Sequence, residues 1–131
     1  MLNLYVLIGF GFSFFVVIFA ASNANADAVA SLERGREIVR QHCTRCHVVA
    51  EMNPYGGIGS TPSFSGMKWL DDWATRFEIF YTLPPHPSLV RIEGISEERI
   101  ASLPAFSKEI TLTLEDVDDI LVFVKTLKMP N

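Results

Sequence analysis

The chain is short of cysteine, histidine and basic side chains, and each shortage narrows its possible functions. It has two cysteines and three histidines in 131 residues, and 11 basic side chains against 15 acidic ones. The net charge of −4 argues against nucleic acid or an anionic membrane surface as the main partner, because both attract basic proteins. No second C-x-x-C and no His pair follows the first, which makes a closed four-ligand zinc site a weak interpretation. The length fits one domain with one core.

Charge is absent altogether from residues 1–26. Most of this segment is one apolar run, followed by small residues at Ala24 and Ala26. The pattern predicts a secretory signal peptide over residues 1–26, cleaved after Ala26. No Lys or Arg precedes the run, which is nearly long enough to span a bilayer, so an uncleaved membrane anchor stays open. In both cases residues 27–131 are expected to be exported, most simply to a bacterial periplasm.

The two cysteines lie in the stretch Cys43-Thr44-Arg45-Cys46-His47. In an oxidising compartment such a pair forms a small disulfide or a redox pair of the thioredoxin type. The redox interpretation needs a βαβ context, and no Val/Ile-rich strand precedes Cys43. Covalent haem attachment uses the whole motif, because both thiols add to porphyrin vinyl groups and His47 ligates the iron. The motif therefore favours one covalently bound haem c per chain.

Helical patterns flank this motif on both sides. Before it, residues 31–41 are predicted to form a helix capped by Ser31, with Gly35 inside it. The clearest helix begins at Thr113, which with Asp116 makes a capping-box pattern. Its apolar stripe consists of Val117, Ile120, Leu121, Val124 and Leu127.

Together, the motif and these helices resemble a small class I c-type cytochrome over residues 31–128. The resemblance implies an all-α, cytochrome c-like fold over residues 27–131. In it the N-terminal and C-terminal helices cross, and a middle helix and long loops surround one haem. Gly35 stands where the family uses a glycine to let these helices approach closely. The resemblance also implies that the carbonyl of Pro62 accepts the second ring N–H of His47 and so orients it.

A middle helix is predicted from Met67 to about Leu83, where two prolines end it. Its aromatic side chains suit packing against a flat porphyrin, and they equally suit any core. Three side chains are candidates for a hydrogen bond to a haem propionate: Trp69, Trp73 and Arg91.

One position departs from the family, in which the sixth iron ligand is a methionine. Leu103 occupies that position here, and its isobutyl group cannot ligate iron. His86 is the first candidate in its place, since Pro85 and Pro87 are expected to hold it in extended, stiff backbone and so lower the entropy cost of ligation. The competing role for His86 is that of a solvated loop histidine. Met67 is the weaker candidate ligand, with core packing as its ordinary role.

The ligand set bears directly on function. Met/His ligation raises the haem potential, so His86 on the iron would give a low-potential carrier. The chain is therefore expected to be an exported monohaem electron-transfer protein, not an enzyme, that docks transiently on redox partners. Its acidic balance favours a basic patch on such a partner. The alternative, motivated by Leu103, is a five-coordinate haem protein that binds a small ligand, as a gas sensor or peroxidase-like protein.

Overall fold

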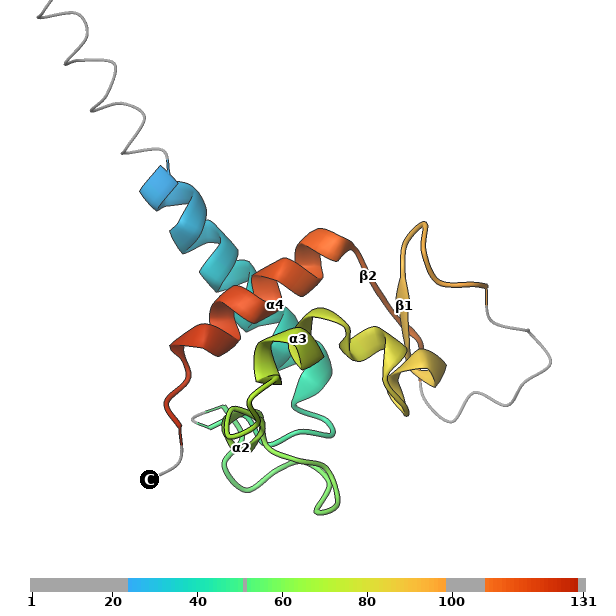
Figure 1. Ribbon diagram of the computed structural model, residues 1–131, viewed down its shortest axis with the longest axis horizontal. Coiled ribbons are helices and arrows are strands. Elements are labelled where there is room, and N and C mark those ends of the chain that lie inside the picture. Colours follow the sequence, from blue (N-terminus) through green and yellow to red (C-terminus); the bar gives the residue numbers. More distant parts are fainter. Residues whose placement is uncertain (1–23, 51, 99–107, 130–131) are drawn as a thin grey trace, which may run out of the picture. The chain divides into compact units, whose positions relative to one another are not determined.

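The computed structural model describes residues 24–50, 52–98 and 108–129 (Figure 1). The predicted signal peptide lies outside this part except for its last three residues, and Leu103 lies wholly outside it. The chain divides into two compact units, Met1–Ser31 and Leu32–Asn131. In the first unit, residues 24–31 are helical. Within the described ranges, no helix combines the length and the apolar character needed to cross a bilayer.

The second unit is mainly helical, as an all-α fold requires. Residues 32–38 are helical and lead into the π-helix η1, Val39–Cys43. The later helices are α2 (Phe64–Met67), α3 (Trp73–Glu78), η2 (Phe80–Thr82), η3 (His86–Ser88) and α4 (Leu114–Thr126). Two short strands, β1 (Val90–Ile92) and β2 (Ile110–Leu112), pair in parallel with Val90 opposite Ile110. The sequence patterns did not indicate this strand pair.

The predicted start of the first helix is wrong, because residues before Ser31 are already helical. This stretch alternates alanine with other residues, and alanine has the highest helix propensity. The predicted contact of Gly35 has a clear structural basis. A Cβ atom on Gly35 would come within 1.9 Å of the carbonyl oxygen of Asp119 in α4. The backbones therefore touch at a point where no side chain fits.

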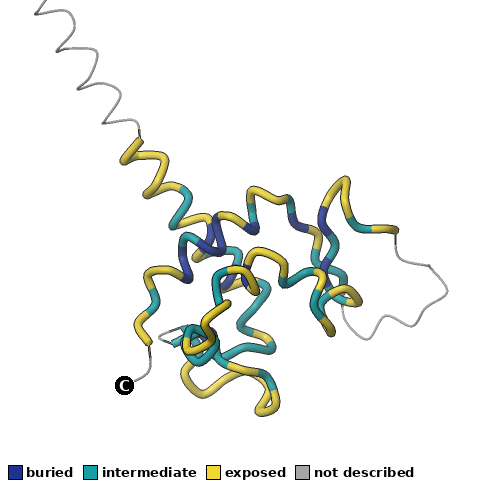
Figure 2. The backbone as a smooth tube through the Cα atoms, viewed as in Figure 1, coloured by how far each residue is buried: buried dark blue, intermediate teal, exposed yellow. Residues whose placement is uncertain are grey.

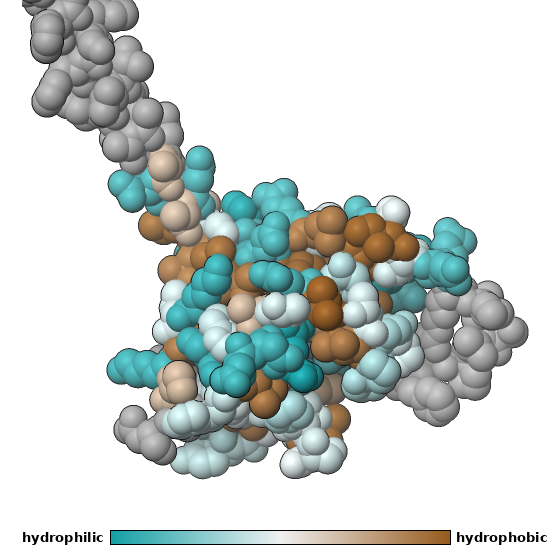
Figure 3. Space-filling model, viewed as in Figure 1, coloured by the Kyte–Doolittle hydropathy of each residue, from teal (hydrophilic) through white to brown (hydrophobic). Residues whose placement is uncertain are grey.

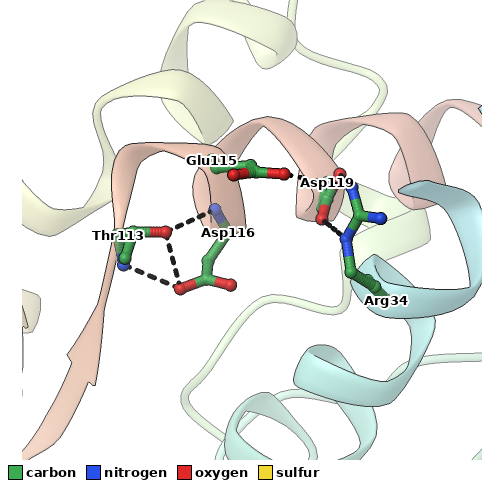
Figure 4. Close-up of polar contacts among 5 residues, drawn as sticks. All are labelled: Arg34, Thr113, Glu115, Asp116 and Asp119. Atoms are coloured by element: carbon green, nitrogen blue, oxygen red, sulfur yellow. Dashed lines mark hydrogen bonds and ion pairs between the residues drawn. The ribbon is translucent and has the colours of Figure 1, made fainter. Parts of the chain in front are cut away.

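An ion pair between Arg34 and Asp119 stabilises the contact between Gly35 and Asp119 (Figure 4). Nε of Arg34 lies 2.6 Å from the carboxylate of Asp119, and the side chain of Asp119 is only 4% exposed. Nη2 of Arg34 lies 3.3 Å from the carboxylate of Glu115. Charged groups that are buried this deeply are normally paired, and here the pair joins residues 32–38 to α4.

Helix α4 forms where the sequence predicts it. The hydroxyl of Thr113 accepts from the N–H of Asp116 at 3.1 Å, and the carboxylate of Asp116 accepts from the N–H of Thr113 at 2.7 Å. This capping box satisfies two N–H groups that the helix leaves without intrahelical partners. At the other end Nζ of Lys68 donates to the carbonyls of Val124 and Lys125, each at 3.2 Å. Buried residues lie mainly along α4 and β1 (Figure 2).

The single middle helix predicted from Met67 to Leu83 is wrong. Helix α2 ends at Met67, and α3 and η2 follow as separate pieces. Between α2 and α3 the backbone bonds are of the tighter i→i+3 kind, for example from Leu70 N–H to the Met67 carbonyl at 3.0 Å. The hydrophobic pattern identified Phe77 as a buried side chain, but Trp69 and Leu70 are exposed because the backbone between α2 and α3 does not continue as one helix.

Hydrophobic side chains remain at the surface, interrupted by hydrophilic ones on the face drawn in Figure 3. Tyr55 is fully exposed, and Trp69 is 62% exposed. Both residues follow the Cys43–His47 motif, here called the attachment motif. Tyr55 lies in the connection before α2, and Trp69 lies in the connection after it.

Candidate functional site

The C-T-R-C-H motif forms a tight turn at the end of η1. The N–H groups of Cys46 and His47 both donate to the carbonyl of Cys43, at 3.1 and 2.9 Å. Neither cysteine forms a disulfide, and both residues are half-buried. Burial, with a smaller contribution from Cys46, raises the pKa of Cys43 to about 12. A reactive redox cysteine has a lowered pKa, so this environment disfavours the thioredoxin-type interpretation.

The imidazole of His47 is fixed by the loop that follows the motif. Its Nδ1 lies 2.8 Å from the carbonyl oxygen of Pro62, which is the contact expected from the resemblance. Because a carbonyl oxygen only accepts, Nδ1 carries the hydrogen and Nε2 keeps a free lone pair. The edge of Phe64 packs against the ring at a centroid distance of 5.2 Å. The histidine thus presents one nitrogen to a ligand and uses the other to hold its orientation.

His86 has the same arrangement. Its Nδ1 lies 3.1 Å from the carbonyl oxygen of Leu83, so its Nε2 also keeps the lone pair. The predicted extended backbone is wrong, because His86 begins the 3-10 helix η3. Proline is tolerated in the first turn of a helix, where its missing N–H costs nothing, so Pro87 does not prevent the turn. The edge of Phe80 contacts the His86 ring at 5.2 Å.

The structure brings these two histidines together. Their ring planes are within 4° of parallel, and their centroids are 5.9 Å apart. Metal–histidine bonds of about 2 Å on each side, plus roughly 1 Å from each nitrogen to its ring centre, require about 6 Å. Two imidazoles that stack directly on each other with an offset can have the same centroid distance. What favours a metal between the rings is that both carry the hydrogen on Nδ1 and leave Nε2 with a lone pair. The ring separation and the two tautomers are therefore compatible with a metal ion between the imidazoles.

Electrostatics keep His86 in the form that ligates metal. Burial lowers its pKa, the hydrogen bond to the Leu83 carbonyl acts in the opposite direction, and the nearby His47 ring lowers the pKa further because two adjacent imidazoles repel each other when both are protonated. A lowered pKa leaves the imidazole neutral at neutral pH. Only the neutral ring has a lone pair to give to iron.

The remaining predicted site residues lie elsewhere. Trp69 stands 62% exposed at the surface, and Met67 is a partly buried residue packed at the edge of the core. Trp73 lies under Nζ of Lys68, which is 5.2 Å from the ring centroid. Nε of Arg91 is 3.5 Å from Glu109, and this nitrogen is buried without a hydrogen bond. Of these side chains, Trp73 is linked to His47 through the ring contacts of Phe77 and Phe64.

Sequence reasoning missed Asn53. Its side chain contacts the backbone of the attachment turn at three points: Thr44, His47 and Val49. The sequence indicated only a turn rich in glycine and proline over residues 53–62. Asparagine in such a turn commonly bonds nearby backbone groups, which was the available signal.

Comparison with known proteins gives one informative similarity. The chain is 27% identical over 74 residues to cytochrome c-552 of Bradyrhizobium diazoefficiens, a match that covers 56% of this chain and 70% of that protein. This similarity supports a c-type cytochrome. No family model matches the sequence, and no solved structure matches it.

Proposed function

We propose that the protein is an exported class I monohaem cytochrome c that transfers electrons, with iron held between His47 and His86. The observation that carries the proposal is the pair of parallel imidazoles 5.9 Å apart, each with Nδ1 on a backbone carbonyl. The similarity to cytochrome c-552 supports a haem carrier rather than an enzyme. The apolar, uncharged residues 1–26 support export to a periplasm.

Each part of the chain has a definite task in this proposal. Cys43 and Cys46 tether the porphyrin through thioethers, so the group is retained in both oxidation states. The carbonyls of Pro62 and Leu83 hold the two imidazoles in place, which limits their movement when the charge on the site changes. Bound haem supplies a one-electron couple, and two imidazoles give it a lower potential than a Met/His pair would.

The fold supports the class I assignment. The contact between Gly35 and Asp119 brings the segment before the motif against the last helix, where the family's helices cross. Partners are proposed to be redox proteins that dock transiently, because an electron carrier must release each partner quickly. The net charge of −4 favours a basic surface on them.

The ferric spectrum tests the ligand assignment. Full-length protein from a haem-maturing host is compared with His86→Ala and with His42→Ala, the third histidine serving as the matched control. Electron paramagnetic resonance and near-infrared magnetic circular dichroism should show two imidazole ligands in the wild type and in His42→Ala. His86→Ala should lose this signature. Identical spectra for wild type and His86→Ala would show that His86 is not a ligand, and a Met/His charge-transfer band would point to Met67.

Covalent attachment needs its own measurement. After acid-acetone extraction the Soret chromophore should remain on the wild-type chain. It should be lost from a Cys43→Ser, Cys46→Ser variant. Extraction of the colour from both would contradict thioether attachment.

The alternative of a five-coordinate haem that binds a small ligand rests on Leu103, which stands where the family has its methionine. Carbon monoxide separates the two proposals. A six-coordinate carrier should bind it slowly or incompletely at neutral pH. An immediate, stoichiometric spectral shift of the reduced protein would favour the ligand-binding role.

A further inference from the structure

The side chain of Asn53 lies against the backbone of the attachment turn. Its oxygen accepts from the N–H of Val49 at 2.7 Å, and its nitrogen donates to the carbonyls of Thr44 and His47, each at 2.8 Å. This uses both amide hydrogens and one acceptor site. The assignment of oxygen and nitrogen is unambiguous, since a flipped amide would set NH₂ against an N–H and oxygen against two carbonyls. One side chain therefore ties the backbone before Cys46 to the backbone after His47.

Gly57 approaches the same backbone from the loop. Its φ of +78° is in the left-handed region, which favours glycine. A Cβ there would lie 3.0 Å from the carbonyl oxygen of Cys46 and 3.0 Å from the carbonyl carbon of His47. The next residue, Ile58, donates its N–H to the same Cys46 carbonyl at 2.8 Å. The peptide group between Cys46 and His47 is thus enclosed by the loop and cannot rotate freely.

These contacts act at one end of the His47 side chain, and Pro62 acts at the other. The ring is fixed through Nδ1 by the Pro62 carbonyl, while the backbone that carries the ring is fixed by Asn53. Without Asn53 the His47 backbone keeps only the hydrogen bond from its own N–H to the Cys43 carbonyl, and the ring keeps the Pro62 bond and the Phe64 contact, so the ring plane is less restricted. The near-parallel alignment with His86 then depends on the amide of Asn53.

We infer that Asn53, supported by the close approach of Gly57, is a positioning residue that sets the orientation of the His47 imidazole relative to His86. The inference rests on the proposed haem site. In the proposed site, Asn53 would control the angle between the planes of the His47 and His86 rings. This role is additional to that of Pro62, whose carbonyl holds the His47 ring.

Electron paramagnetic resonance of the ferric holoprotein tests the inference, since the signal of a bis-imidazole haem depends on the angle between the ring planes. Parallel planes give three resolved g-values, and planes turned toward perpendicular give one broad low-field feature. We expect the resolved signal for the wild type. Asn53→Asp keeps the acceptor for Val49 but loses both donors, so its signal should shift toward the low-field form. Asn53→Ala should shift at least as far.

Gly57→Ala and Gly59→Ala form a matched pair in the same loop. A Cβ on Gly57 meets the backbone of the motif, whereas one on Gly59 has nothing within 4 Å. Gly57→Ala should change the signal, and Gly59→Ala should leave it as in the wild type. If the Asn53 variants accumulate no haem, the comparison of Gly57→Ala with Gly59→Ala still tests whether the loop sets the orientation of the His47 ring.

The possible outcomes separate the inference from the proposal beneath it. A wild-type protein without a bis-imidazole signal overturns the proposed ligand set itself. A wild type with that signal, and unchanged signals in the Asn53 and Gly57 variants, overturns only the positioning role. If the melting temperature falls while the signal stays the same, the amide serves the fold alone, and the inference is again wrong.

Discussion

Gly35 and Asp119 are in backbone contact, so close that a single methyl group on Gly35 would overlap the Asp119 carbonyl. The two residues are far apart in the sequence and join the segment before the attachment motif to α4. The motif follows Gly35 by only a few residues, and therefore the position of the whole turn depends on this contact.

Gly35→Ala should destabilise the protein strongly. The new Cβ meets backbone that cannot move aside as a side chain would, and overpacking of this kind costs about 3 kcal/mol. Chemical denaturation of the holoprotein measures the loss. Gly59→Ala is the control and should stay within about 0.5 kcal/mol of the wild type. A small effect at Gly35 would mean that the helices separate easily.

Thr113→Ala should cost about 1 kcal/mol, because the first turn of α4 loses its capping hydrogen bond. Thr113→Ser keeps a hydroxyl and should recover most of the stability. Thermal denaturation of the three proteins compares them. Equal melting temperatures for Thr113→Ala and wild type would show that the box seen in Figure 4 adds nothing to stability.

Lys68→Met should destabilise the end of α4. The ammonium donates to the last carbonyls of the helix, where a positive charge is favoured, and losing these bonds should cost about 1 kcal/mol. Lys108→Met, at an exposed position, is the control. Amide hydrogen exchange should show faster opening over the last turn in the Lys68 variant alone. Uniform exchange in both variants would contradict this role.

The ferric low-spin spectrum should persist as the pH falls below the ordinary histidine pKa of about 6.5. Burial lowers the pKa of His86 in the folded chain, so the unfolded chain binds the proton first. The free energy of unfolding therefore has its full value above the pKa of His86 in the unfolded chain. It decreases as the pH falls from there through the lowered pKa of His86 in the folded chain. In the proposed haem site iron ligation would act in the same direction, since metal and proton would compete for one lone pair. A spectrophotometric acid titration measures the pH at which the low-spin spectrum is lost. A transition to high spin centred above pH 6.5 would contradict the prediction.

The sequence predicts those parts of the site that depend on short-range patterns. The capping box of α4 follows from Thr113 and Asp116 alone, whereas the close approach at Gly35 was expected only from the resemblance to the family. The proximity of His47 and His86 depends on tertiary packing across 39 positions, so the spacing could only make His86 a candidate. The signal peptide and the role of Leu103 stay predictions, because they lie outside the described residues.

The errors have a common physical cause. The hydrophobic pattern from Met67 to Leu83 does not distinguish one helix from several short turns, and for that reason it also placed the exposed Trp69 and Leu70 on the buried face. Proline beside His86 was taken to exclude a helical turn, yet the first turn of a helix accepts it. Asn53 was overlooked because its three partners are backbone groups, so that the turn residue type was the available signal and its partners could not be identified from the sequence.

The ring contacts also give the protein an optical property. Trp73 packs edge-on against Phe77, Phe77 against Phe64, and Phe64 against His47, at centroid distances of 6.2, 5.0 and 5.2 Å. A haem on His47 would lie close enough to Trp73 to quench its fluorescence by non-radiative resonance energy transfer. The folded holoprotein should therefore be weakly fluorescent and brighten when the chain unfolds. The emission of Trp73 would report on the distance between α3 and the C-T-R-C-H turn without any added label, with that of Trp69, which lies outside α3, added to it.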